Sequence, residues 1–172
     1  MSLDGPRQIA AWSAFLRKLR AFFDSRGFFE VQTDHVVPAG AFEGTLDTLR
    51  VSWRGGTGEL HTSPEIEMKR LLAADRLPIY EICRCFRDDP ATPIHRREFT
   101  MLEYYRVDAD YRRCLAEMRE LLTELTGRAL PFEEYTVAEL VREKTGIDLD
   151  RMQTSRGYRS CKGGRLSGLG LP

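Results

Sequence analysis

The residues best suited to chemistry lie near the middle of the chain. Arg87 ends one expected strand, and four side chains alternate along the next expected strand: Phe99, Met101, Glu103 and Tyr105. Alternating side chains of a strand point to the same face of its sheet. An arginine, an aromatic ring, a carboxylate and a phenol on one face would suit a phosphate, a nucleotide base and an ammonium group. A sheet face packed by helices, with Glu103 in a salt bridge to an arginine, would show the same pattern.

A second polar group precedes these strands at residues 62–65. It predicts the start of a helix, with Ser63 as the N-cap, Pro64 at the first helical position and Glu65 in the first turn. Taken alone, Glu65 is a first-turn charge that favours the helix dipole, and Ser63 is explained by capping.

The remaining pattern predicts the elements that position these residues. Apolar residues spaced by three and four predict a helix over 9–25, which ends before Gly27. Further helices are expected at 63–74, 111–126 and 136–144, and strands at 28–33, 45–51, 59–61, 78–87 and 98–105. The turn 54–58 joins two of these strands, and the polar loop 88–97 joins the last two. Helices that flank a mainly antiparallel sheet form an α+β domain.

The composition fits one compact domain followed by a tail. The chain has 172 residues, of which 42% are hydrophobic and 30% are charged. We expect the folded domain in residues 1–150 and disorder in residues 151–172, which are rich in Gly, Ser and Arg. The formal net charge of +0 gives no global field that would attract a polyanion, so any RNA contact would be local.

The four cysteines show no spacing of a zinc site. There is no C-x-x-C pair, and Cys83 and Cys85 fall on the same side of an expected strand, where we interpret them as reduced core thiols. No signal peptide opens the chain, and no apolar run approaches membrane-spanning length. The sequence therefore predicts a cytoplasmic protein without a membrane partner.

Together the two polar blocks resemble the class II aminoacyl-tRNA synthetases. Phe86-Arg87, a loop that contains His95, and the run 98–105 are similar to motif 2 of that class. The run Glu-Phe-Thr-Met-Leu-Glu-x-Tyr narrows the resemblance to the lysyl-tRNA synthetase branch. Residues 62–65 and 68–72 match the same branch, and especially the shorter elongation factor P lysine ligases. The resemblance covers residues 9–145 and implies a class II antiparallel sheet flanked by helices.

The resemblance implies an ATP site around motif 2. Arg87 would be the catalytic residue, binding the α-phosphate of ATP and the lysine carboxylate and neutralising charge that develops between them. Phe99 would stack on adenine. The ATP-binding residues that the resemblance implies are Arg87, Asp88, Asp89, His95, Arg96 and Phe99.

Several of these positions depart from the family pattern. Asp89 stands where the family has a glutamate that reads the adenine amino group. His95 would approach the distal phosphates. Arg96 and Arg97 replace the usual Asn and Pro, so two added cations would either strengthen triphosphate binding or fill the slot.

The resemblance also implies a substrate site formed by Ser63, Pro64, Glu65, Glu103 and Tyr105. Ser63 and Glu65 would fix the amino acid, with Glu65 on its α-ammonium group. Tyr105 would line the pocket of the lysine side chain, and Glu103 would add negative charge there.

Other parts of the family pattern lie at or beyond the ends of this chain. Residues 26–34 resemble the family's dimerisation element and predict a homodimer. The adenylation chemistry needs Mg²⁺, whose ligands we expect in a C-terminal part, after residue 172, together with the motif 3 arginine. No anticodon-binding barrel precedes the first helix, which favours the free-standing ligase type.

The sequence therefore predicts ATP-dependent activation of lysine or β-lysine as an adenylate and its transfer to a lysine of elongation factor P. One alternative is a catalytic fragment that charges tRNA(Lys). Another is a remnant that binds nucleotide and dimerises without turnover.

Overall fold

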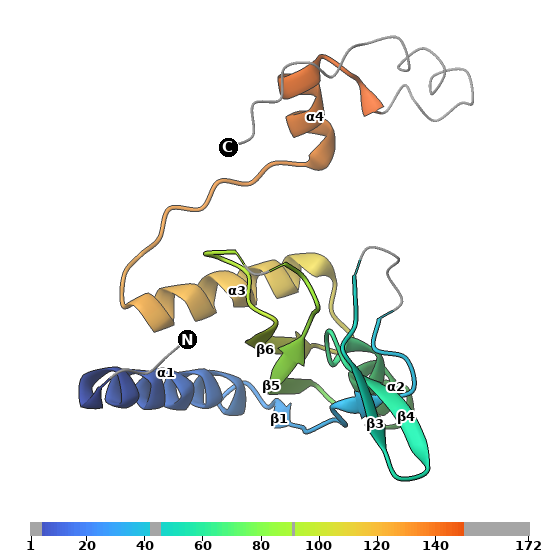
Figure 1. Cartoon of the computed structure of the whole chain (residues 1–172). Coiled ribbons are helices and arrows are strands. Elements are labelled where there is room, and N and C mark those ends of the chain that lie inside the picture. Colours follow the sequence, from blue (N-terminus) through green and yellow to red (C-terminus); the bar gives the residue numbers. More distant parts are fainter. Residues whose placement is uncertain (1–4, 42–45, 91, 150–172) are drawn as a thin grey trace. The chain divides into compact units, whose positions relative to one another are not determined.

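The computed structural model describes residues 5–41, 46–90 and 92–149. The chain divides into two compact units, residues 1–130 and 131–172. In sequence order the first unit contains α1 (Pro6–Asp24), β1 (Phe29–Glu30), β2 (Val36–Val37), β3 (Arg50–Trp53), β4 (Gly56–Leu60), α2 (Glu65–Asp75), β5 (Ile79–Phe86), β6 (Glu98–Tyr105) and α3 (Tyr111–Thr126). The α+β class predicted from the sequence is confirmed (Figure 1).

The central sheet has the strand order β1-β5-β6. β5 and β6 are antiparallel along their full length, with Cys85 opposite Phe99 and Glu81 opposite Glu103. β1 pairs with β5 in parallel through only two residues. The hairpin of β5 and β6 is therefore the rigid part of the sheet, and it carries both halves of the motif 2 run.

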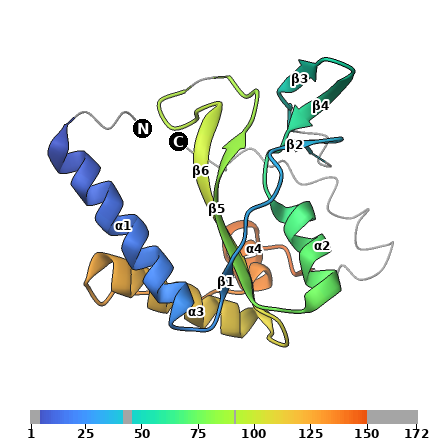
Figure 2. The same cartoon turned by 90° about the horizontal axis from the view of Figure 1, so that it is seen from below.

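The hydrophobic core lies where α1 and α3 pack on one face of this sheet. Phe23 is 1% exposed, and its ring stacks on Tyr80 of β5 with the centroids 4.6 Å apart. The other buried members of the cluster are Leu19, Phe22, Phe28 and Leu121. Figure 2 shows α1 and α3 on one side of β5 and β6, and α2 with the second sheet on the other. α1 and α3 cover one face of the sheet, and the candidate site lies on the other face.

A second sheet has the order β2-β4-β3, all antiparallel. β3 and β4 form a hairpin with Arg54 and Gly55 at its turn, and Gly55 has a φ of +88°, which favours glycine. The sequence placed these strands at 45–51 and 59–61, and it predicted no strand at β2. The structure has β3 later and β4 earlier in the sequence than these predicted ranges, because the tight turn brings Trp53 opposite Gly56.

α2 differs from the expectation at its start. The helix begins at Glu65 with Pro64 in the capping position, and no side chain caps it. Ser63, expected as the N-cap, instead accepts a hydrogen bond at 3.1 Å from the backbone N–H of Glu65. The serine hydroxyl lies one residue before the cap, and it also donates to a side chain of the site described below.

The described part of the second unit is centred on α4 (Val137–Thr145). Thr136 caps this helix in a capping box with Glu139, and Gly146 ends it in the left-handed conformation. The predicted boundary at 150/151 and the predicted disorder of 151–172 concern a segment outside the described residues. Among the described residues, no helix is both long and apolar enough to span a membrane.

Candidate functional site

A cavity of about 320 Å³ opens between the start of α2, strand β6 and the chain around residue 40. Four of the predicted site residues line it: Ser63, Glu65, Arg87 and Glu103. The other lining residues are Gly40, Ala41, Leu46, Thr62, Ile66 and Met101. Two carboxylates and one guanidinium group therefore face a single chamber, which suits a small molecule with both amino and carboxylate groups.

Glu103 is held by two hydroxyl groups. Ser63 Oγ donates to its Oε2 at 2.8 Å, and the Tyr105 hydroxyl donates to its Oε1 at 2.5 Å. Burial, and then the hydrogen bond to Glu103, raise the pKa of Tyr105, so the phenol stays protonated and remains a donor. The packed-face alternative, in which Glu103 is in a salt bridge to an arginine, has no counterpart among the ion pairs of the described residues.

The other two predicted substrate residues, Pro64 and Tyr105, are not among the residues that line this cavity. Glu65 lines the cavity but forms an ion pair with Lys69, one turn along α2. Pro64 is fully buried under the start of α2 and does not line the cavity. Lys69 is exposed, as expected for a solvated helix face.

A second cavity, of about 280 Å³, is also lined by Arg87. It is lined by Arg87, Asp89, Ile94, His95, Arg96 and Phe99, so it gathers five of the six predicted ATP-binding residues. Three cationic or potentially cationic side chains and one aromatic ring suit a planar base that carries phosphates. The sixth residue, Asp88, is not among the lining residues.

Arg87 is the residue that the two cavities share. Its guanidinium carbon lies 5.1 Å from the centroid of the Phe99 ring. Its Nε is buried without a hydrogen-bond partner, and the guanidinium forms no ion pair, within the residues that the structure describes. A buried donor without a partner is costly, and a bound anion would satisfy it.

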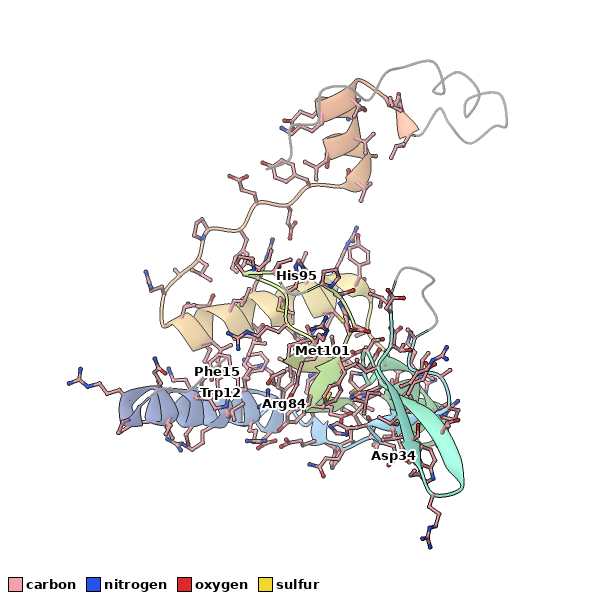
Figure 3. The ribbon with its side chains drawn as sticks, in the orientation of Figure 1. Trp12, Phe15, Asp34, Arg84, His95 and Met101 are labelled. Carbon is pink, nitrogen blue, oxygen red and sulfur yellow. The ribbon has the colours of Figure 1, made fainter. Side chains whose placement is uncertain are left out.

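The loop between β5 and β6 positions His95 (Figure 3). Thr92 Oγ1 lies 2.9 Å from His95 Nδ1 and accepts a hydrogen bond from the His95 backbone N–H at 3.0 Å. These bonds leave Nε2 of the ring available to a ligand. At the base of the loop, Arg97 donates to Asp88 Oδ1 at 2.9 Å, so this pair closes the loop instead of facing the cavity.

The structure adds Gly40 and Thr62, which the sequence did not single out as site residues. The backbone N–H of Gly40 donates to Glu59 Oε2 at 2.8 Å, and its carbonyl accepts from Thr62 Oγ1 at 2.9 Å. A Cβ on Gly40 would lie 2.6 Å from the carbonyl oxygen of Leu60. Only a glycine permits this close approach. The feature of the sequence that could have indicated it is a glycine at position 40 between two alanines.

The one cluster of three or more potential metal ligands among the described residues does not suit Mg²⁺. The one group of three or more His, Cys, Asp or Glu side chains gathered among them is His61, Cys83 and Cys85. Mg²⁺ prefers oxygen ligands, and sulfur donors do not fit it.

A family model described as tRNA synthetases class II (D, K and N) matches residues 6–161. An elongation factor P–(R)-β-lysine ligase of Mannheimia succiniciproducens is 37% identical over 139 residues, which cover 77% of this chain and 43% of the relative. A homologue of that ligase in Aquifex aeolicus is 34% identical over 84% of this chain and 50% of its own. The ligase of Photobacterium profundum is 38% identical over 67% of this chain and 38% of its own. The chain thus spans half or less of the length of these relatives.

Proposed function

Because the chain belongs to the class II tRNA synthetases of the D, K and N type, we propose that it forms the ATP- and lysine-binding part of a ligase. In the proposed reaction, a carboxylate oxygen of lysine or β-lysine attacks the α-phosphorus of ATP, and pyrophosphate leaves. An amino group of the acceptor then attacks the carbonyl carbon of the adenylate, and AMP leaves. The substrate carboxylate is the nucleophile, so no serine or cysteine nucleophile is needed.

This proposal rests mainly on Arg87, which lines both cavities. A guanidinium group presents several donors in one plane and can bind a carboxylate and a phosphate together. With the amino acid in the first cavity and the nucleotide in the second, the reacting carboxylate and phosphorus would meet at this group. Arg87 would then stabilise the charge that develops as the new bond forms.

The second cavity supports the nucleotide assignment. Phe99 provides an aromatic face for the base, and His95 and Arg96 provide positive charge for the distal phosphates. Asp89 lines the same cavity and would accept a hydrogen bond from the adenine amino group. With Asp88 engaged by Arg97, Asp89 is the carboxylate that remains for this role.

The first cavity supports an amino acid with two amino groups. Glu65 and Glu103 both line it; Glu103 would attract one ammonium group, and Glu65 would attract the other in place of Lys69. Ser63 and Tyr105 fix the orientation of the Glu103 carboxylate. Lysine and β-lysine both place two amino groups and a carboxylate on one short chain, which matches this set of charges.

Elongation factor P is the acceptor that we propose, because the similar ligases named above act on it. Charging of tRNA(Lys) is the second candidate function. It is favoured by the family model, whose description names tRNA synthetases. A comparison of elongation factor P with tRNA as the acceptor, using the full-length gene product, separates these two candidates.

The central test measures ATP binding and lysine-dependent exchange of pyrophosphate into ATP with the 172-residue chain. We expect Arg87→Ala to weaken ATP binding by about tenfold or more, since a hydrogen bond to a charged group contributes about 1.5–3 kcal/mol. Arg84→Ala is the matched control, because Arg84 lies in β5, is half-exposed and faces Glu98 at 3.6 Å.

An unchanged dissociation constant for ATP in Arg87→Ala would refute the role of Arg87. ATP and lysine binding without exchange would support the alternative of a binding part without turnover. If the chain binds neither ligand, the assignment of both cavities is wrong.

A further inference from the structure

A second group of reactive side chains lies beside the cavities and has no part in the proposed reaction. His61 follows β4, while Cys83 and Cys85 lie in β5 on either side of Arg84, which Figure 3 labels. The three residues are only 2%, 7% and 0% exposed. A ring nitrogen of His61 and the two sulfur atoms all lie within 4.8 Å of one another.

We propose that His61, Cys83 and Cys85 bind one zinc ion. The two sulfur atoms are 3.7 Å apart. Two thiolates on a tetrahedral zinc ion, each with a Zn–S bond of about 2.3 Å, would be separated by about 3.8 Å. Two thiolates and an imidazole are also the donor types that zinc prefers over harder cations. The strand therefore already holds the sulfur atoms at the separation that zinc requires.

The orientation of His61 supports the same site. Its Nε2 lies 2.7 Å from the carbonyl oxygen of Arg84 and donates to it in the corresponding tautomer. Histidine ligands of metals commonly donate their second N–H to such a carbonyl. The other nitrogen, Nδ1, is buried and has no partner at hydrogen-bond geometry in the part of the chain that the structure describes, although the Cys83 thiol interacts with the ring. A metal ion would satisfy this lone pair.

Glu81 does not add a fourth ligand to these three. Glu81 lies on the same face of β5, but it accepts hydrogen bonds from the backbone N–H and the hydroxyl of Thr33, each at 3.0 Å. The fourth tetrahedral position would be taken by a solvent molecule. On binding, each thiol would release its proton to solvent as its sulfur bonds to the ion, and no oxidation state would change.

The ion would connect the two sheets beside the cavities. His61 directly follows β4 of the second sheet, and the cysteines belong to β5 of the central sheet. Cys85 is opposite Phe99 and Cys83 is opposite Met101, and each of these partners lines a cavity. We therefore infer a structural ion that fixes the wall of the candidate site.

The test uses cobalt(II) as a spectroscopic probe on the reduced, chelator-treated 172-residue chain. We expect a thiolate-to-cobalt charge-transfer band that one equivalent of zinc removes. Cys83→Ser and Cys85→Ser should each lose the band. The double variant Cys114→Ser/Cys161→Ser, which keeps only the two cluster thiols, should retain it. Absence of the band in the native chain, or its persistence in both single variants, would overturn the proposal.

Thermal unfolding provides a second measurement that does not depend on the folding of the variants. Zinc that binds only the folded chain raises its unfolding temperature by mass action. We expect this rise for the native chain and equally for Cys114→Ser/Cys161→Ser. An unfolding temperature that zinc leaves unchanged in the native chain would also overturn the proposal.

Discussion

Replacing Glu103 by glutamine tests whether the first cavity binds an ammonium group. The Glu103 oxygens each already accept one hydroxyl hydrogen bond, from Ser63 at 2.8 Å and from Tyr105 at 2.5 Å. A carboxylate has about four lone-pair sites, so roughly two remain for a ligand. Glutamine keeps the shape of the side chain; one hydroxyl can still donate to the amide oxygen, and the other can rotate to accept from the amide N–H. The fold should therefore survive, and the change removes mainly the negative charge.

The expected effect is on lysine alone. A charge-assisted hydrogen bond contributes about 1.5–3 kcal/mol, which corresponds to a weakening of lysine binding by roughly 10- to 150-fold. ATP binding should change little, because Glu103 lines only the first cavity. Calorimetric titration with lysine, in the presence of a non-hydrolysable ATP analogue, measures the first quantity, and titration with the analogue alone measures the second.

Tyr105→Phe is the matched control, because it removes one hydrogen bond and leaves the charge of Glu103 in place. It should weaken lysine binding much less than Glu103→Gln does. A lysine dissociation constant that stays within about twofold of the native value in a folded Glu103→Gln chain would show that Glu103 has only a packing role. An equal loss of ATP affinity would show instead that the two cavities do not bind separate ligands.

Two further predictions concern the support of the site. Gly40→Ala should lower the free energy of unfolding, measured in urea, by about 1–3 kcal/mol. The added Cβ would lie 2.6 Å from the Leu60 carbonyl oxygen and would force the cavity wall to shift. An unchanged midpoint of the urea transition would contradict this close approach. Glu30 accepts hydrogen bonds from Arg20, which hold the pKa of this carboxyl below its ordinary value. The charged Glu30 carboxylate therefore adds to the free energy of unfolding above the ordinary pKa of glutamate, and this contribution is lost as the pH falls through the lowered value. When the free energy of unfolding is measured as a function of pH, Glu30→Gln should make it fall less steeply on the acid side.

The longer elements could be predicted from the sequence because their local signals are strong. The helix at 111–126 coincides with α3, whose Asp110 cap and Gly127 end are both visible in the sequence. The strand at 98–105 coincides with β6. β1 and β2 have two residues each, which is too short for any periodic pattern, so the first was predicted too long and the second was missed.

The parts of the site that the sequence did not predict depend on contacts between distant segments. Gly40 reaches the cavity through bonds to Glu59 and Thr62, about twenty residues away. His61 comes beside Cys83 and Cys85 only because the chain after β4 runs beside the end of β5 that β1 does not pair with, where the Phe86 N–H donates to the His61 carbonyl at 3.1 Å. No spacing rule for adjacent ligands would reveal such a group. The interpretation of both cysteines as reduced core thiols agrees with the structure, in which they are free and buried.

The shared position of Arg87 has a consequence for the energetics of binding. If one guanidinium group serves both ligands, the free energies of binding ATP and lysine cannot be additive, because each ligand changes the charge available to the other. The resulting coupling must be reciprocal, so the factor by which ATP changes the affinity for lysine equals the factor by which lysine changes the affinity for ATP. Arg87 would then couple the binding of the two ligands, in addition to its catalytic role.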